Sequence, residues 1–226
     1  MCSVIERSHQ EKHMKIGIIG SGNIGGTLGQ HWAKVGHEVT FSSRNPDSLR
    51  SMAESVGAQV GTVEETAAFG EVILLAIPFG KIPEVAQQIG PLDGKISIDA
   101  GNPYPHRDGE MAQQVIDDPE ETATGYVAKQ FPGAKTIKAF NSIYFKVLEE
   151  KAFRSGDDRI AVQVCGDDVE AKQTVMQLIA EIGFAPQDLG DLSQGVLFEP
   201  DAPLYNQNLE IGEAEARLSQ IQSQPK

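Results

Sequence analysis

The fold is decided by the stretch Lys15-Ile16-Gly17-Ile18-Ile19-Gly20-Ser21-Gly22-Asn23-Ile24-Gly25. Its first half, residues 15–20, is a short apolar run that ends in glycine, which is typical of a strand covered on both faces by helices. Apolar residues then recur at helical spacing from Ile24 to Val35, and Gly36 follows as the expected C-cap. Strand, glycine turn and helix in this order begin a β-α-β unit.

The same alternation continues along the chain. Further strands are expected at residues 37–42, 59–61, 72–77, 96–99, 136–140, 160–165 and 185–189, and helices at 46–56, 62–70, 82–89, 124–131 and 169–182. The stretch 101–121 is rich in Pro and Asp and predicts a loop with one embedded helical turn. The pattern predicts an α/β fold: a doubly wound Rossmann fold with a mostly parallel sheet of about eight strands and a short helical extension at about 192–226.

The composition is typical of a globular protein, since 40% of the 226 residues are hydrophobic and 23% are charged. We expect a flexible tail at 1–13 and one domain at 14–226 that includes the extension. The longest apolar run, residues 72–79, is far shorter than the roughly 20 residues that span a bilayer. The tail lacks the apolar segment of a secretory signal. We therefore expect no membrane segment and a cytoplasmic location.

The charge balance excludes further classes of partner. There are 32 acidic and 19 basic residues, so the formal net charge is −13. This charge repels a phosphate backbone and predicts that nucleic acid is not a partner.

The five histidines show no metal-ligand spacing, and no metal site is predicted.

The glycine spacing matches the dinucleotide-binding pattern G-x-G-x-x-G. Gly20 would allow the tight turn, Gly22 the close approach of a diphosphate, and Gly25 the close packing of helix against strand. The amides at the start of the helix would then face the phosphates. The alternative interpretation is a glycine-rich turn that binds no ligand.

The residues after the second strand favour NADP(H) over NAD(H). NAD-preferring sites place an acidic residue there, whereas this chain has Ser42-Ser43-Arg44-Asn45. Two hydroxyls and the guanidinium of Arg44 suit a 2′-phosphate, and Asn45 beside them is also a cofactor-binding candidate. The alternative is that Ser42 and Ser43 only turn the chain while Arg44 is solvated.

The residues just after the other strands are the next candidates, because ligands of open parallel sheets bind at the carboxyl ends of the strands. These candidates are Ile77, Pro78, Phe79, Asn102 and Asn141. Ile77 and Pro78 could pack on the nicotinamide face, and Asn102 or Asn141 could bond the carboxamide. Each asparagine could instead simply form a turn.

The chain resembles the NADP oxidoreductases that act with the deazaflavin coenzyme F420. The resemblance covers about residues 14–192. It rests on residues 15–20 with the glycine loop and on Gly36-His37-Glu38-Val39, Ser43-Arg44-Asn45-Pro46, Ala76-Ile77-Pro78-Phe79, Lys138-Ala139-Phe140-Asn141 and Cys165-Gly166-Asp167-Asp168. A similar pattern occurs in the cytosolic reductase domain of the six-transmembrane metalloreductases, which move electrons from NADPH to a flavin.

The resemblance implies that Ser21, Asn23 and Ile24 line the phosphates and that Ser43 and Arg44 hold the 2′-phosphate. It also implies direct hydride transfer between C4 of the nicotinamide and a small-molecule acceptor, either F420 or a flavin such as FMN or FAD. The protein would then supply orientation, and no catalytic acid or base is expected.

Two other functions stay open from the residues themselves. A redox sensor would bind NADP(H) without turnover. A reductase of a small carbonyl or imine would need a proton donor, for which Tyr104, Tyr144 and His106 are the candidates. The extension is too apolar for a free end, so it packs either on its own domain or on a second subunit, and we expect a homodimer.

Overall fold

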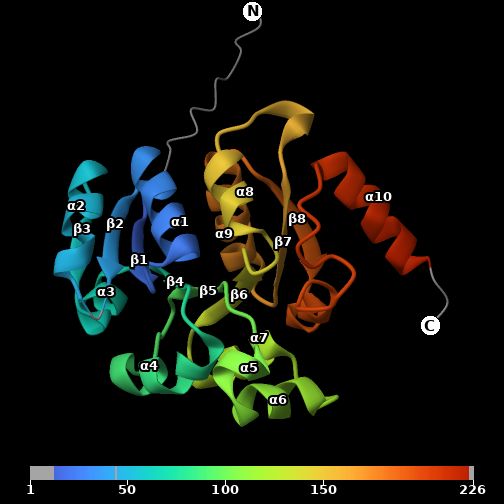
Figure 1. The fold of residues 1–226 in the computed structure, drawn as a ribbon, viewed down its shortest axis with the longest axis horizontal. Helices are drawn as coiled ribbons and strands as arrows, with labels where there is room; N and C mark the ends of the chain where they lie inside the picture. The colour runs from blue at the N-terminus through green and yellow to red at the C-terminus, as the bar shows by residue number, and fades with distance from the viewer. Residues whose placement is uncertain (1–12, 44, 224–226) are drawn as a thin grey trace, which may run out of the picture.

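The computed structural model describes residues 13–43 and 45–223, and within these ranges eight strands form one sheet. Their order across the sheet is β3-β2-β1-β4-β5-β6-β7-β8 (Figure 1). The strands are β1 (Lys15–Ile19), β2 (Glu38–Ser42), β3 (Gln59–Gly61), β4 (Val72–Leu75), β5 (Ile96–Asp99), β6 (Lys135–Ala139), β7 (Ala161–Gly166) and β8 (Ala185–Gly190). Neighbouring strands are parallel, except that β7 runs antiparallel to β6. The predicted Rossmann fold with a mostly parallel sheet is confirmed.

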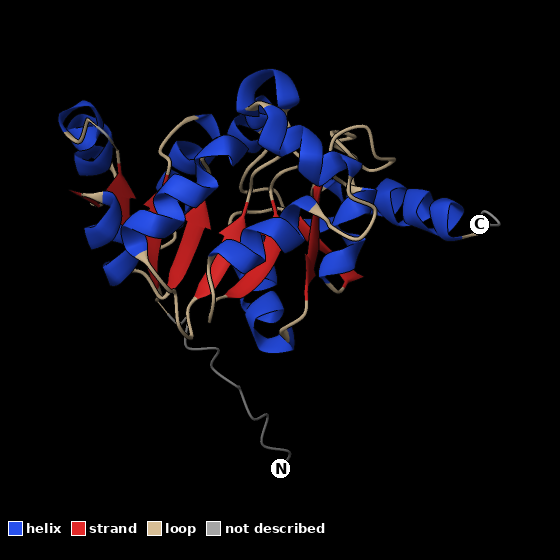
Figure 2. Ribbon diagram, turned by 90° about the horizontal axis from the view of Figure 1, so that it is seen from below, coloured by secondary structure: helices blue, strands red, loops and turns tan. Residues whose placement is uncertain are grey.

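Helices cover both faces of this sheet (Figure 2). They are α1 (Asn23–Lys34), α2 (Asp47–Ser55), α3 (Val63–Phe69), α4 (Ile82–Ile89), α5 (Pro105–Asp108), α6 (Glu110–Asp117), α7 (Ala123–Gln130), α8 (Phe145–Glu150), α9 (Val169–Glu181) and α10 (Ile211–Gln222). Short 3-10 helices lie at Phe79–Lys81, Gly156–Asp158 and Leu192–Leu197. None of the helices in the described part of the chain combines the length and the apolar character needed to cross a membrane.

Two apolar clusters lie on opposite faces of the sheet. One contains buried residues of α1, α8 and α9, and the other contains buried residues of α3, α4, α6 and α7. Successive residues of β4 alternate between them, because Leu74 belongs to the first cluster and Ile73 and Leu75 to the second. This alternation follows from the two-residue period of a strand, and it requires an apolar residue at every position of a central strand.

Side-chain caps fix where several helices begin. Thr62 Oγ1 accepts a hydrogen bond from the amide of Glu65 at 3.2 Å, and the Glu65 carboxylate accepts one from the amide of Thr62 at 2.9 Å. This reciprocal pair starts α3. Asp168 starts α9 in a similar way, since its carboxylate accepts from the amide of Ala171 at 2.8 Å.

The stretch 101–121 contains more helix than predicted. The structure places both α5 and α6 there, where the sequence indicated a loop with a single helical turn. The reason is that Ala112 and Val115 are buried in the second apolar cluster. Two small anchors among polar residues give a weak periodic signal, although they are enough to hold α6 against its neighbours.

The C-terminal extension packs on its own domain. Phe198 and Leu204 are buried in a third apolar cluster with Cys165, and Leu218 of α10 packs against that cluster. The sequence left open whether the extension packs on its own domain or on a second subunit, and these residues pack on their own domain. The tail at 1–13 lies outside the described residues except for His13.

Candidate functional site

The three glycines of the loop between β1 and α1 differ in what surrounds them. Gly20 has a φ of +95°, and a methyl group built there would collide with the carbonyl oxygen of Ala76. A methyl group at Gly25 would collide with the carbonyl oxygen of Gly20. At Gly22 a methyl group would meet no atom of the described residues within 4 Å. Two glycines thus serve the fold, and the third leaves an open cradle.

The cradle at Gly22 lies at the positive end of α1. Gly22 is the N-cap residue, and among the described residues no side chain caps this end or supplies an acidic group to the first turn. The amides of the first turn have no partner within the helix, so they can bind an anion. Open space and free amides are what the diphosphate of a dinucleotide requires, and this part of the chain fits such a cofactor.

The end of β2 lies beside the glycine loop. Ser21 Oγ donates to the carbonyl oxygen of Ser42 at 2.9 Å, which ties the two together. Ser42 is buried, and its hydroxyl donates to the carbonyl oxygen of Ile18 at 3.0 Å, so it is not placed to reach a 2′-phosphate. Ser43 Oγ accepts from the amide of Asn45 at 3.1 Å. Arg44 lies outside the described residues.

A cleft of about 350 Å³ lies next to the cradle, across the carboxyl ends of the central strands. It is lined at the ends of four parallel strands by Gly22, Asn23, Ile24, Ala76, Ile77, Pro78, Ala100, Gly101, Asn102, Phe140, Asn141, Ser142, Ile143, Tyr144 and Phe145, and further by Tyr104, Arg107, Tyr205 and Asn206. The chain reverses its direction of winding between β1 and β4, and this is where open α/β sheets bind ligands. Gly22 and Asn23 also line a second hollow of about 290 Å³.

Phe79 does not belong to this cleft, in contrast to Ile77 and Pro78. Its ring is 1% exposed, lies in the second apolar cluster and packs against Tyr126 with ring centroids 5.3 Å apart. The prediction that Phe79 contacts the cofactor is therefore not supported by its position. The chain turns into a 3-10 helix at Phe79, which directs this side chain into the core.

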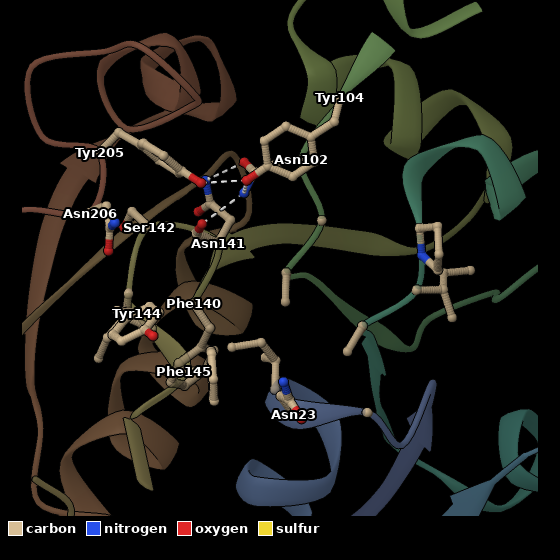
Figure 3. A pocket seen from close by; sticks show the side chains of 18 of the residues that line it. Asn23, Asn102, Tyr104, Phe140, Asn141, Ser142, Tyr144, Phe145, Tyr205 and Asn206 are labelled. Carbon is tan, nitrogen blue, oxygen red and sulfur yellow. Dashed lines mark hydrogen bonds between the residues drawn. The ribbon is translucent and has the colours of Figure 1, made fainter. Parts of the chain in front are cut away.

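The structure brings the two predicted asparagines together (Figure 3). Asn102 Nδ2 donates to the carbonyl oxygen of Asn141 at 2.8 Å, and Asn141 Nδ2 donates to Asn102 Oδ1 at 3.1 Å and to the carbonyl oxygen of Phe198 at 2.8 Å. Asn141 Oδ1 is buried and accepts no hydrogen bond from any described residue. The pair thus leaves a buried acceptor atom without a partner among the described residues, at a residue that lines the cleft.

Phe140 directs Asn141 toward this position through an unusual backbone conformation. Its φ is +67°, in the left-handed region that residues other than glycine rarely adopt. The ring is buried and packs edge-on against Trp32 with centroids 5.8 Å apart. Strain of this kind, about 1–3 kcal/mol, persists where packing over-determines it and is frequent at functional sites.

A buried ion pair, which the sequence did not predict, lies next to the cleft-lining residue Gly101. Lys138 Nζ is 3.0 Å from Asp99 Oδ2, donates to the carbonyl oxygen of Gly101 at 3.1 Å and lies 3.9 Å from Glu199 Oε1. Thr124 Oγ1 also donates to Asp99, at 2.7 Å. These contacts fix the strand ends that carry the asparagine pair. A charged residue inside the apolar pattern of β6 was the available signal.

Among the candidate proton donors, Tyr104 and Tyr144 line the cleft. His106 is exposed and is not among the residues that line it. The hydroxyls of Tyr104 and Tyr205 form a hydrogen bond at the cleft, although Tyr205 was not a candidate. The two tyrosines are 101 residues apart in the sequence, so no local pattern predicts that they meet.

Asp108 holds the segment that carries Tyr104. Its carboxylate accepts from the amides of Tyr104 at 2.9 Å and Gly80 at 3.1 Å and forms an ion pair with Arg107 at 2.7 Å. Burial by itself would raise the pKa of Asp108, but the hydrogen bonds from Arg107 and from these amides outweigh burial and lower the pKa. The carboxylate is therefore ionised at neutral pH.

An open glycine cradle and a cleft across the strand ends of a doubly wound sheet define a dinucleotide-binding Rossmann protein. Residues 15–103 match the family model "NADP oxidoreductase coenzyme F420-dependent". The match confirms the resemblance predicted from the sequence, over this part of the chain.

Curated relatives are similar over most of this chain. Over 181 residues, the chain is 33% identical to metalloreductase STEAP3 of Rattus norvegicus. The matched stretch covers 79% of this chain and 34% of that protein. The chain thus spans about a third of the length of the curated relatives it matches.

Two solved structures are similar over most of their length. A hypothetical protein of Sinorhizobium meliloti has a TM-score of 0.73 and 28% identity, with 87% of this chain and 95% of that chain covered. A proposed F420-dependent NADP reductase of Arthrobacter sp. FB24 has a TM-score of 0.67 and 25% identity, with 80% and 87% covered.

Proposed function

We propose that this protein is an NADP(H)-dependent oxidoreductase that transfers hydride directly between the nicotinamide and a deazaflavin or flavin-like acceptor. The observation that carries the proposal is one cleft lined both by Gly22 of the open cradle and by Asn141, whose Oδ1 has no partner among the described residues. When bound, the cofactor supplies the hydride. The chain's own residues bind and orient: the first-turn amides of α1 hold the diphosphate, and Ile77 and Pro78 form the nicotinamide platform.

Asn141 sets the orientation of the nicotinamide in this proposal. Both hydrogens of its Nδ2 are used by Asn102 and by the carbonyl oxygen of Phe198. Its Oδ1 is left to accept a hydrogen bond from the carboxamide N–H of the cofactor. This bond would fix which face of the ring turns toward the acceptor, since a ring that can rotate in the cleft exposes either face.

The aromatic residues of the cleft support a planar acceptor. Tyr104, Tyr144, Phe145 and Tyr205 all line the cleft, and the rings of Tyr144 and Phe145 lie 4.8 Å apart. Aromatic side chains stack on flat conjugated rings. The names of two relatives, a metalloreductase and an F420-dependent NADP reductase, also favour a redox acceptor of this kind.

The test is NADPH oxidation by the purified protein with F420, FMN, FAD, ferric chelates and a panel of small carbonyls and imines. We expect turnover with F420 or with a flavin. Tight NADPH binding with no acceptor reduced would instead favour the redox sensor, and turnover with carbonyls or imines alone would favour the small-substrate reductase. A homodimer and a cytoplasmic location stay predictions from the sequence.

The preference for NADP(H) gives a separate prediction. Replacing Arg44 by alanine should weaken binding of NADPH by roughly 10- to 150-fold, because a charge-assisted hydrogen bond to the 2′-phosphate contributes about 1.5–3 kcal/mol. NADH has no 2′-phosphate, so its binding should change little. Dissociation constants of both cofactors, measured by fluorescence titration, provide the comparison. An equal loss for NADPH and NADH would exclude Arg44 as the phosphate-binding residue.

A further inference from the structure

Two tyrosine hydroxyls meet at the cleft from distant parts of the chain. Tyr104 follows β5, and Tyr205 lies between the 3-10 helix Leu192–Leu197 and α10. Figure 3 shows the two rings pointing toward one another beside Asn102 and Asn141. Their hydroxyl oxygens are hydrogen-bonded, and both residues line the same cleft as Ile77.

Each tyrosine is held in place by its surroundings. The amide of Tyr104 donates to Asp108, and the guanidinium of Arg107 lies over the Tyr104 ring, 4.9 Å from its centroid. The chain around Tyr205 is tied to the loop after β6, because the amide of Asn206 donates to the carbonyl oxygen of Ser142 at 2.9 Å. The hydroxyl pair is thus a fixed feature of the cleft wall.

The pair has one proton more than its own hydrogen bond needs. Two neutral hydroxyls carry two protons, and one of these lies between the oxygens. The second proton is available to a molecule in the cleft. Burial, followed by the hydrogen bond with Tyr104, raises the pKa of Tyr205, so Tyr205 stays protonated at neutral pH.

We propose that the Tyr104–Tyr205 pair donates a hydrogen bond, and then a proton, to the acceptor that takes the hydride. This inference rests on the proposed function and adds a chemical requirement to it. The acceptor must carry a lone-pair oxygen or nitrogen conjugated with the atom that receives the hydride. Carbonyls, imines and the ring systems of flavins and deazaflavins share this property.

The step balances with NADPH as the reductant. Hydride leaves C4 of the nicotinamide and forms the new bond to the acceptor, whose π electrons move to the conjugated oxygen or nitrogen. That atom takes a proton from one tyrosine, and the resulting tyrosinate is stabilised by the hydroxyl of the other. Solvent returns the proton. The sum is NADPH, acceptor and one proton giving NADP⁺ and the acceptor with two added hydrogens.

Tyr104→Phe and Tyr205→Phe test this proposal, with Tyr126→Phe as the control. Tyr126 packs against Phe79 at the second apolar cluster and is not among the residues that line the cleft. Single-turnover hydride transfer is followed by NADPH absorbance in H₂O and D₂O across pH, with FMN, F420 and a small carbonyl or imine in separate arms. NADPH affinity and melting temperature are measured for every variant.

We expect Tyr104→Phe and Tyr205→Phe each to slow hydride transfer by about 10²- to 10⁴-fold, the usual contribution of a positioned proton donor, and to remove the solvent isotope effect. NADPH affinity and melting temperature should stay near wild type, and Tyr126→Phe should retain the rate. The arm with the largest loss identifies the acceptor class. Wild-type rates in both pair variants, with any acceptor that wild type reduces, would overturn the proposal. If wild type reduces none, the proposed function and this inference both fail.

Discussion

Lys138→Met is expected to destabilise the protein by about 3–5 kcal/mol, the usual cost of removing one partner of a buried ion pair. Lys138 is 0% exposed and Asp99 is 1% exposed, so the carboxylate of Asp99 would remain in the interior without its counter-charge. Glu199, which is also close to Lys138, would lose the same partner. Urea unfolding at neutral pH measures the change in the free energy of unfolding.

Lys135→Met is a matched control on the same strand. Lys135 forms an ion pair with Asp168 at 3.0 Å, but their side chains are 38% and 34% exposed. Solvent screens such a pair, and its loss should cost no more than about 1 kcal/mol. A double variant, Lys138→Met with Asp99→Asn, should be more stable than Lys138→Met alone, because no charge is then left unpaired between these two positions. Equal losses for Lys138→Met and Lys135→Met would contradict the assignment of a buried pair.

The glycine loop gives the second large expected effect. Gly22→Ala should weaken NADP(H) binding by about 100-fold, because a methyl group in the cradle overpacks the diphosphate contact, an effect of about 1–3 kcal/mol. The fold should be almost unchanged, since that methyl group meets no described atom within 4 Å. Calorimetric titration with NADPH and thermal melting measure the two quantities on the same sample.

Gly25→Ala should show the opposite order of effects. Its methyl group would collide with the carbonyl oxygen of Gly20, so α1 must move away from β1, and a drop in melting temperature is expected before any cofactor is added. If Gly22→Ala melted as early as Gly25→Ala, the cradle would be part of the packing instead of a ligand site. If Gly22→Ala bound NADPH normally, the diphosphate would lie elsewhere.

The sequence predicts best where function depends on neighbours along the chain. The spacing of Gly20, Gly22 and Gly25 predicts a turn, an open approach and a close packing, and the spaces around these glycines agree with each role. Asn102 and Asn141 could be predicted as candidates, because each follows a strand. Their mutual hydrogen bonds could not, since these depend on the parallel pairing of β5 with β6.

Contacts between distant segments leave no local pattern. Lys138 and Asp99 are 39 residues apart, and Tyr104 and Tyr205 are 101 residues apart. Ser42 and Phe79 show the opposite case, because both lie at or just after the end of a strand but neither side chain is free to bind a ligand. The Ser42 hydroxyl donates to a carbonyl oxygen of β1, and the Phe79 ring is buried in the second apolar cluster. Position after a strand indicates where a site lies, and the direction of each side chain is decided by packing.

The reversed direction of β7 has a consequence for how this protein can change. Because β7 and β8 run against β6, their carboxyl ends lie away from the cleft, and the chain must return along the sheet to place Tyr205 and Asn206 there. One short contiguous stretch near the C-terminus therefore adds Tyr205 and Asn206 to a cleft whose other lining residues all precede β7. Substitutions in that stretch can reshape this part of the cleft while the glycine loop is inherited unaltered.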